Sequence, residues 1–188
     1  MAPQAERIRI ELSHLGKNAS TSLRVHYPGI TVEKPGANIS RAITSQMPTL
    51  SISSKVSNLD GSKRYIAICL DPDAPYPSMP IMGPIAHGIQ GDLKLASTEG
   101  SPGWLLLNAT TKPVLPYLPP SPPPLSSPHR YLFLLWEQPE GLSGMDIRTR
   151  LELPEEPGMM VRVKWDEVAF EEKIGLGMVL ASTYFLCS

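Results

Sequence analysis

The stretch Arg64-Tyr-Ile-Ala-Ile-Cys-Leu-Asp-Pro-Asp-Ala-Pro75 decides the fold of this chain. Residues 65–70 are apolar on successive positions, which is typical of a strand that is buried on both faces of a sheet. Asp71 follows directly, and the proline after it favours extended backbone at Asp71. The stretch therefore predicts a central strand that ends in a carboxylate and opens into a stiff polar loop.

Further short β-like runs, separated by Gly, Pro, Asn or Ser, recur along the chain and indicate a mainly β fold with few helices. The strand candidates are Ile8–Leu12, Leu23–Tyr27, Thr49–Ser53, Arg64–Leu70, Trp104–Leu107, Tyr131–Trp136 and Met159–Lys164. Tyr131–Trp136 is again apolar throughout and is expected to be a second central strand. Helical spacing appears in Trp165–Ile174, before Gly175, and more weakly in Arg148–Leu153.

The length of 188 residues favours one domain spanning residues 1–188, whose first 47 residues are expected to be N-terminal strands. The formal net charge of -1 lacks the basic excess of a nucleic-acid-binding protein. No apolar stretch approaches the roughly 20 residues of a transmembrane helix, and the N-terminus lacks the apolar core of a secretory signal. We therefore expect a cytoplasmic protein without a transmembrane segment or a nucleic-acid partner.

Of the 21 prolines, 13 lie in two segments, Asp71–Pro84 and Pro113–Pro128, and each segment adjoins one of the two central strands. A disordered linker is one interpretation of residues 113–128, half of which are proline. The neighbouring core strand favours an ordered surface loop instead, because proline reduces the entropy that a loop loses on ordering. Two stiff loops beside two buried strands are expected to form the walls of one pocket.

Asp71, His87 and His129 are the candidate chemical groups of that pocket, because they lie at or near the ends of the expected central strands. Histidines paired with a carboxylate bind an anion when protonated and act as a base when neutral. The alternative interpretations are a turn-starting Asp-Pro pair and a core histidine. Arg130 is expected to point away from His129 and to pair with an acid. No HxxxH or CxxC spacing is present, so we expect neither a metal ion nor another cofactor.

These motifs together resemble the phosphatidylethanolamine-binding protein family, also called Raf kinase inhibitor-like. The resemblance rests on Leu70-Asp-Pro-Asp-Ala-Pro75, a following histidine, Pro128-His-Arg-Tyr-Leu-Phe-Leu-Leu-Trp-Glu-Gln138 and an ending similar to that of fungal members, and it runs from Pro48 to Phe185. It implies a large, mostly antiparallel central sheet packed on a smaller sheet, a short C-terminal helix and a small anion pocket. The residues that it assigns to the pocket are Asp71, Asp73, His87, Tyr117, His129, Tyr131 and Phe185, with Asp73 supporting the loop and Phe185 over the mouth.

The chain departs from the family pattern at three places around this pocket. Tyr76-Pro77 stands where a basic residue is usual, Gly88 stands where a tryptophan is frequent and is expected to leave that wall open, and Pro119 replaces a glycine and cannot donate a backbone N–H. These departures favour a larger, partly apolar acid as the ligand.

Three functions remain open at this stage. The first is binding of a small phosphate- or carboxylate-bearing ligand, with modulation of a partner protein. The second is an enzyme, or an auxiliary to a biosynthetic enzyme, in fungal secondary metabolism. It would assist cyclisation or dimerisation of an acidic or anhydride intermediate, with Asp71, His87, His129 and Tyr131 as the acid-base groups. The third is inhibition of a kinase or a peptidase, and the short N-terminus makes the peptidase inhibitor the least favoured.

Overall fold

The computed structural model describes residues 3–17 and 21–188 of the chain, with side chains described for all of these except residues 3–6 and 97–100. The strands are β1 (Leu23–Tyr27), β2 (Ile30–Val32), β3 (Ala37–Asn38), β4 (Thr49–Ser53), β5 (Tyr65–Asp71), β6 (Ile85–Ser101), β7 (Trp104–Ala109), β8 (His129–Glu137) and β9 (Ala181–Cys187). The helices are α1 (Pro3–Lys17), α2 (Gly144–Arg150) and α3 (Glu167–Ile174), with short 3-10 turns η1 (Ile43–Ser45) and η2 (Met159–Val161).

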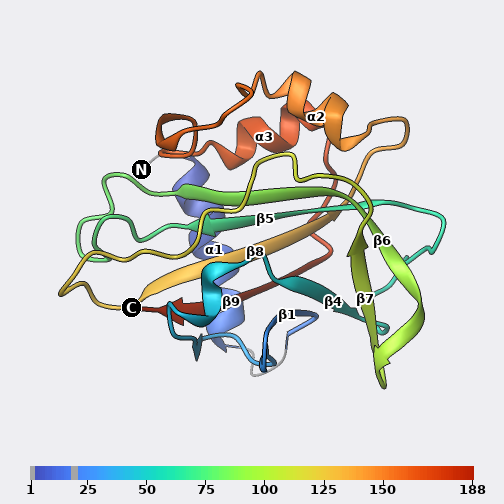
Figure 1. The fold of residues 1–188 in the computed structure, drawn as a ribbon, viewed down its shortest axis with the longest axis horizontal. Helices are drawn as coiled ribbons and strands as arrows, with labels where there is room; N and C mark the ends of the chain where they lie inside the picture. The colour runs from blue at the N-terminus through green and yellow to red at the C-terminus, as the bar shows by residue number, and fades with distance from the viewer. Residues whose placement is uncertain (1–2, 18–20) are drawn as a thin grey trace.

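The strands form one continuous sheet in the order β2-β1-β4-β7-β6-β5-β8-β9-β3, antiparallel except for the β3–β9 pair. The long strand β6 pairs with β5 through residues 85–93 and with β7 through residues 93–101. Because β6 and β7 curve together, β7, β4 and β1 turn away from the central strands (Figure 1). The expected smaller sheet is therefore the β2-β1-β4-β7 part, which remains hydrogen-bonded to the large part through β6.

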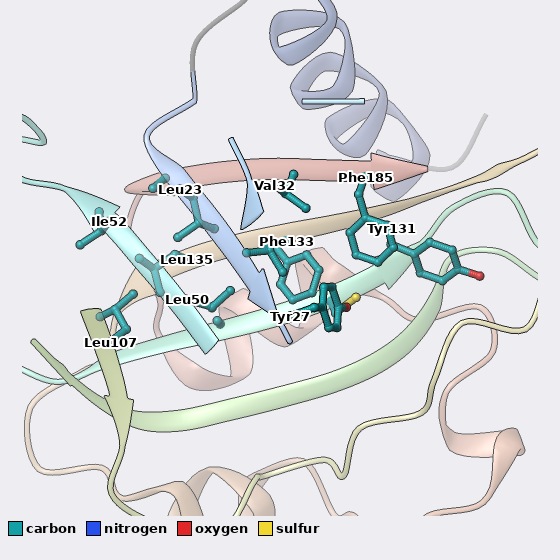
Figure 2. Close-up of a cluster of buried hydrophobic side chains, with 14 of the residues drawn as sticks. Leu23, Tyr27, Val32, Leu50, Ile52, Leu107, Tyr131, Phe133, Leu135 and Phe185 are labelled. Carbon is teal, nitrogen blue, oxygen red and sulfur yellow. The ribbon is translucent and has the colours of Figure 1, made fainter. Parts of the chain in front are cut away.

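The central strands β5 and β8 are buried on both faces, as their unbroken apolar sequences predict. On one face Tyr65 and Phe133 join a cluster with residues of β1 and β4, which Figure 2 shows between the two parts of the sheet. On the other face Ile66 and Leu134 join a second cluster beneath the helices. Two apolar layers thus hold the ends of β5 and β8 in fixed positions.

The prediction of a strand at Ile8–Leu12 is wrong, because these residues belong to helix α1. Ile8, Leu12 and Leu15 follow helical spacing and are buried against the sheet and α3, whereas Ile10 is 45% exposed. The alternation of Ile8, Ile10 and Leu12 mimics a strand. Residues 1–47 therefore do not consist of strands alone, and residues 1–2 and 18–20 lie outside the described part. No helix in the described residues is long and apolar enough to span a membrane.

The helix predicted at Trp165–Ile174 is confirmed as α3, with an Asp166 cap that accepts from the Ala169 N–H at 2.9 Å and a left-handed Gly175 at its end. The weaker helical prediction at Arg148–Leu153 corresponds to the last part of α2 and the turn after it.

The strand predicted at Met159–Lys164 is wrong. This segment forms η2 and a turn, and its backbone bonds to residues 82–86 instead, with Ala86 N–H donating to the Arg162 carbonyl at 2.9 Å.

Candidate functional site: a pocket at the ends of β5, β6 and β8

The loop after β5 is fixed by its own aspartates. The Asp71 Oδ1 atom accepts the Asp73 backbone N–H at 2.8 Å, which closes a turn around the intervening proline. Asp73 then accepts the Arg130 backbone N–H at 2.8 Å and its Nε–H at 2.9 Å. The expected pairing of Arg130 with an acid is confirmed, and it ties this loop to the start of β8.

The proline-rich loop 113–128 is an ordered wall whose backbone bonds to β6. Leu115 and Ile89 exchange two backbone hydrogen bonds of 3.0 and 3.1 Å, and Leu118 N–H donates to the His87 carbonyl at 2.6 Å. The hydroxyl of Tyr117 lies 3.0 Å from that of Tyr27, on the side of the loop that faces the sheet. Both proline-rich loops leave the same end of the sheet (Figure 1, left).

Between these loops lies a cavity of about 390 Å³. It is lined by Asp71, Ala74, Pro75, Met82, Ile85, His87, Leu118, Pro119, Ser121, Pro123, His129, Tyr131 and Met159. Four of the predicted site residues, Asp71, His87, His129 and Tyr131, therefore meet in one cavity although they come from three strands. The remaining walls are predominantly apolar, and Ser121 is the one further polar side chain among these residues.

His129 and Asp71 form a buried pair at the polar wall of the cavity. The Nδ1 atom of His129 lies 2.8 Å from Asp71 Oδ2, so Nδ1–H donates to the carboxylate. Burial alone would lower the pKa of His129, but the hydrogen bond and the charge of Asp71 outweigh it and raise the pKa above its usual value. The other ring nitrogen lies 3.0 Å from Ser126 Oγ, whose hydrogen is donated to the Ser127 carbonyl, an arrangement that suits a protonated ring.

The pKa of His87 is shifted in the opposite direction to that of His129. Its Nδ1 atom lies 2.7 Å from the Leu118 carbonyl oxygen, which only accepts, so Nδ1 carries the hydrogen. Burial lowers the pKa of His87 below its usual value, although the Leu118 bond and the charge of Asp71 act in the other direction. Neutral His87 therefore has a bare Nε2 atom, 4.0 Å from Asp71 Oδ2.

Arg162 is a part of the site that sequence reasoning missed, because a single arginine outside any motif gives no signal. It is 5% exposed, and its guanidinium donates to the carbonyls of Ala86 at 3.1 Å, His87 at 3.4 Å and Pro116 at 2.8 Å. No described carboxylate forms an ion pair with it, and burial lowers its pKa. Arg162 thus places an uncompensated positive charge behind His87 and joins β6 to the proline-rich loop.

Three residues that the resemblance assigned to the pocket, Asp73, Tyr117 and Phe185, do not line the cavity; Asp73 supports the adjoining loop through Arg130, as expected. Phe185 is fully buried and does not cover the mouth, because its ring stacks on Tyr131 with centroids 5.2 Å apart, inside the core cluster. Figure 2 shows the Tyr131 hydroxyl pointing away from that cluster. Tyr117 likewise is not among the lining residues, since its hydroxyl bonds to Tyr27 and to the Thr44 carbonyl.

The expectation that Gly88 opens a wall of the pocket is wrong. A Cβ atom on Gly88 would lie 3.3 Å from the Tyr117 Cα atom, so the backbone of the proline-rich loop occupies that space. Pro119 does line the cavity, in line with its place in the loop. The proline-rich loop therefore packs against Gly88, which does not line the cavity.

Burial and the charge of Asp71 raise the pKa of Tyr131 well above its usual value, so its phenol remains a hydrogen-bond donor. In the described part of the chain no three His, Cys, Asp or Glu side chains are grouped as a metal site requires. The pocket thus offers a carboxylate, two imidazoles of different proton affinity and a phenol, which suits binding of an acid or transfer of a proton.

A mainly β protein with a small polar pocket between two proline-rich loops at the strand ends is a ligand-binding architecture. The family model "Phosphatidylethanolamine-binding protein" matches residues 28–180, and the chain belongs to this family.

Among curated proteins, the chain is 34% identical to the carboxypeptidase Y inhibitor of Saccharomyces cerevisiae over 86 residues, which are 42% of this chain and 39% of that protein. It is 26% identical to the protein BROTHER of FT and TFL 1 of Arabidopsis thaliana over 168 residues, which are 89% of this chain and 80% of that protein. The chain thus spans well under half the length of the yeast relative in this alignment.

Among solved structures, the carboxypeptidase Y inhibitor complexed with its cognate proteinase superimposes with a TM-score of 0.68 at 20% identity, covering 98% of this chain and 93% of that one. A phosphatidylethanolamine-binding protein from Plasmodium vivax superimposes with a TM-score of 0.63 at 18% identity, covering 98% and 97%. At these identities the similarity shows a shared fold.

Proposed function

We propose that this chain binds a small organic acid, phosphate- or carboxylate-bearing, in the cavity between its two proline-rich loops. The observation that carries the proposal is the placement of buried Asp71, His87 and His129 at one wall of a cavity whose other walls are largely apolar. A few convergent polar groups in an otherwise apolar hollow are the usual make-up of a small-molecule site.

The charges around the cavity support an acidic head group. The negative charge of Asp71 is balanced by the His129 imidazolium when that ring is protonated, and Arg162 then leaves a positive excess behind the wall. An apolar body of the ligand would contact Met82, Ile85 and Met159. This composition favours a partly apolar acid over a bare inorganic anion.

Thermal unfolding with phenyl phosphate as probe tests this proposal. At a probe concentration of about 100 Kd, binding is expected to raise the Tm of the wild type by roughly 5–10 °C. His129→Ala and Asp71→Ala are expected to lose this rise. His26→Ala is the matched control, because His26 is bonded to Thr31 and Ser51 on β2 and β4, outside the cavity. A probe-induced rise that persists in both pocket variants would refute the assignment of the site.

Acid-base catalysis is a second candidate, because the two imidazoles beside Asp71 have pKa values shifted in opposite directions. The pKa of His129 is raised and that of His87 is lowered. A bare His87 Nε2 is a base, and the Tyr131 hydroxyl would donate to a developing oxyanion. Such chemistry would suit an enzyme or auxiliary protein that cyclises or dimerises acidic or anhydride intermediates in fungal secondary metabolism. Exchange of the α-hydrogens of phenylpyruvate in D₂O is expected above the buffer rate and lost in His87→Ala. Exchange at the buffer rate would refute this candidate.

A protein partner is consistent with the yeast relative, which is a carboxypeptidase inhibitor solved with its proteinase. Inhibition of carboxypeptidase Y by this chain at micromolar concentration would extend the proposal to a peptidase partner. Full peptidase activity at that concentration would exclude this partner.

A further inference from the structure

The hydrogen atoms of the pocket determine which kind of acid it accepts. The Leu118 carbonyl fixes the hydrogen of His87 on Nδ1 at a distance of 2.7 Å. In a neutral imidazole the other nitrogen is then an acceptor with no hydrogen. Asp71 Oδ2, 4.0 Å from that nitrogen, is also an acceptor and already receives the His129 Nδ1–H. The polar wall thus presents two acceptors side by side.

The surroundings of His87 oppose a second hydrogen on its ring. Arg162 contributes a cation from the segment after η2, bonded to the His87 carbonyl itself. His129 on β8 contributes another positive charge, and Tyr131 places its ring at a right angle, with centroids 5.0 Å apart. Among the described side chains, the one negative group that faces His87 is Asp71, which is shared with His129.

We propose that the pocket selects acids whose head group still carries a hydrogen, such as the monoanion of a phosphate monoester, over anions of equal size and charge that carry none, such as a sulfate monoester. This inference rests on the proposed binding of an acid in the same cavity. The P–O–H group donates to Asp71 Oδ2 or His87 Nε2. The remaining oxygens accept from the hydroxyls of Tyr131 and Ser121; the latter accepts from Arg41 at 2.7 Å and keeps its own hydrogen.

A sulfate monoester has the same shape and one negative charge but places a bare oxygen against the two acceptors. The loss of one charge-assisted hydrogen bond, together with lone-pair repulsion, is expected to weaken binding by about 10- to 100-fold. The second ionisation of a phosphate monoester lies near pH 6, so the fraction that carries the hydrogen falls about tenfold per pH unit above it.

Calorimetric titration with phenyl phosphate and phenyl sulfate between pH 6 and pH 8 tests the inference. Phenyl phosphate is expected to bind at least about tenfold more tightly at pH 6 and to weaken by about tenfold per pH unit at higher pH. Phenyl sulfate is expected to bind weakly at every pH. Equal affinities at pH 6, or phenyl phosphate binding that strengthens as the pH rises, would overturn the inference.

The sulfate probe also separates this mechanism from an imidazolium clamp. A clamp made by protonated histidines would bind both probes and release both as the pH rises, which would overturn the inference while leaving the proposed function intact. Absence of phenyl phosphate binding at every pH would instead count against the proposed function itself.

Arg162→Met provides the structural test, with Arg148→Met as its matched control. Arg148 also donates to loop carbonyls, those of Val114 and Glu155 at 2.8 Å, but it is not among the groups that face His87. Without the Arg162 charge, His87 gains its second hydrogen more readily, and phenyl sulfate binding is expected to increase as the pH falls towards 6. Arg148→Met is expected to retain the wild-type preference, and an unchanged preference in Arg162→Met would contradict the role of Arg162.

If Arg162→Met does not fold, His87→Gln replaces it. Its side-chain amide brings donor hydrogens to the same wall, so the preference for phenyl phosphate over phenyl sulfate is expected to shrink by about tenfold or more. A preference equal to that of the wild type would overturn the proposal.

Discussion

Asp73 beside the pocket and Glu167 at the contact between α1 and α3 are both buried carboxylates, but only Asp73 accepts hydrogen bonds from nearby donors. In the loop that borders the pocket, Asp73 is 2% exposed and accepts hydrogen bonds from the Arg130 backbone and guanidinium. Beneath α1, Glu167 is fully buried and neither of its oxygens has a hydrogen-bond partner, although Arg7 lies 4.0 Å away. A buried carboxylate is stable as an anion only where donors compensate its lost hydration.

The difference shows in the protonation of the two regions. Burial, then the charge of Glu171, raise the pKa of Glu167 to about 7. Asp71 instead binds His129, and Asp73 binds Arg130. These two contacts fix the walls of the ligand site. Carboxylates with hydrogen-bond donors thus organise the surroundings of the pocket, whereas the carboxylate without donors makes the helix contact sensitive to pH.

The largest effect is expected from Arg130→Met, which leaves buried Asp73 with only a backbone donor. Although the Arg130 side chain is half-exposed, Asp73 is buried, so the carboxylate left behind is poorly compensated and the free energy of unfolding is expected to fall by about 3–4 kcal/mol. Arg64→Met is the matched control, since Asp92 also loses an arginine but keeps Gln138, Thr111 and the Gly144 N–H. The free energy of unfolding of Arg64→Met is expected to fall by only about 1 kcal/mol. Urea denaturation of both variants measures the difference, and equal losses would contradict the role of the donors.

Glu167→Gln is expected to have the next largest effect, and only at neutral to alkaline pH. The folded chain keeps the Glu167 proton up to about pH 7, whereas the unfolded chain loses it near its usual value of 4.5. The unfolded state therefore binds fewer protons within this window, and this group costs stability progressively as the pH rises through it. The variant is expected to match the wild type near pH 4.5 and to exceed it by up to about 3 kcal/mol at pH 8. Denaturation curves at both pH values measure this; a constant difference would contradict it.

The smallest effect is expected from Asp71→Asn on the titration of His129. The folded His129 ring has a raised pKa, so its stabilising contribution is complete below pH 6.5 and is lost as the pH rises through the folded value. An amide in place of the carboxylate removes the charge that raises the pKa of His129, so burial is expected to lower that pKa. NMR titration of the His129 ring protons measures this shift, and an unchanged pKa would show that Asp71 does not hold the ring.

The sequence predicts the pocket better than it predicts the surroundings of the pocket. Asp71 and His129 lie next to long apolar strands, and the strand ends of one sheet meet in space, so their convergence follows from pattern alone. Most of β6 could not be predicted in this way, because Gly88, Gln90 and Gly91 interrupt its apolar pattern. Pairing with β5 makes this segment a strand.

Helix α1 and Arg162 could not be predicted for different reasons. The sequence from Ile8 to Leu15 fits both a strand and a helix, and only contacts with the sheet and α3 choose the helix. Arg162 lies in a segment that resembles a strand in composition. Its role depends on carbonyl groups of β6 and the proline-rich loop, which are distant in sequence and carry no residue-type signal.

The central claim is that one carboxylate, Asp71, lies between two histidines of opposite proton affinity in a ligand-binding cavity. NMR titration of ¹⁵N-labelled histidines, with and without phenyl phosphate, tests it most directly. We expect His129 to titrate above 6.5 and His87 below it, with neutral His87 protonated on Nδ1 and both rings shifted by the probe. The reverse order of pKa values, or ring resonances that phenyl phosphate leaves unmoved, would contradict the account.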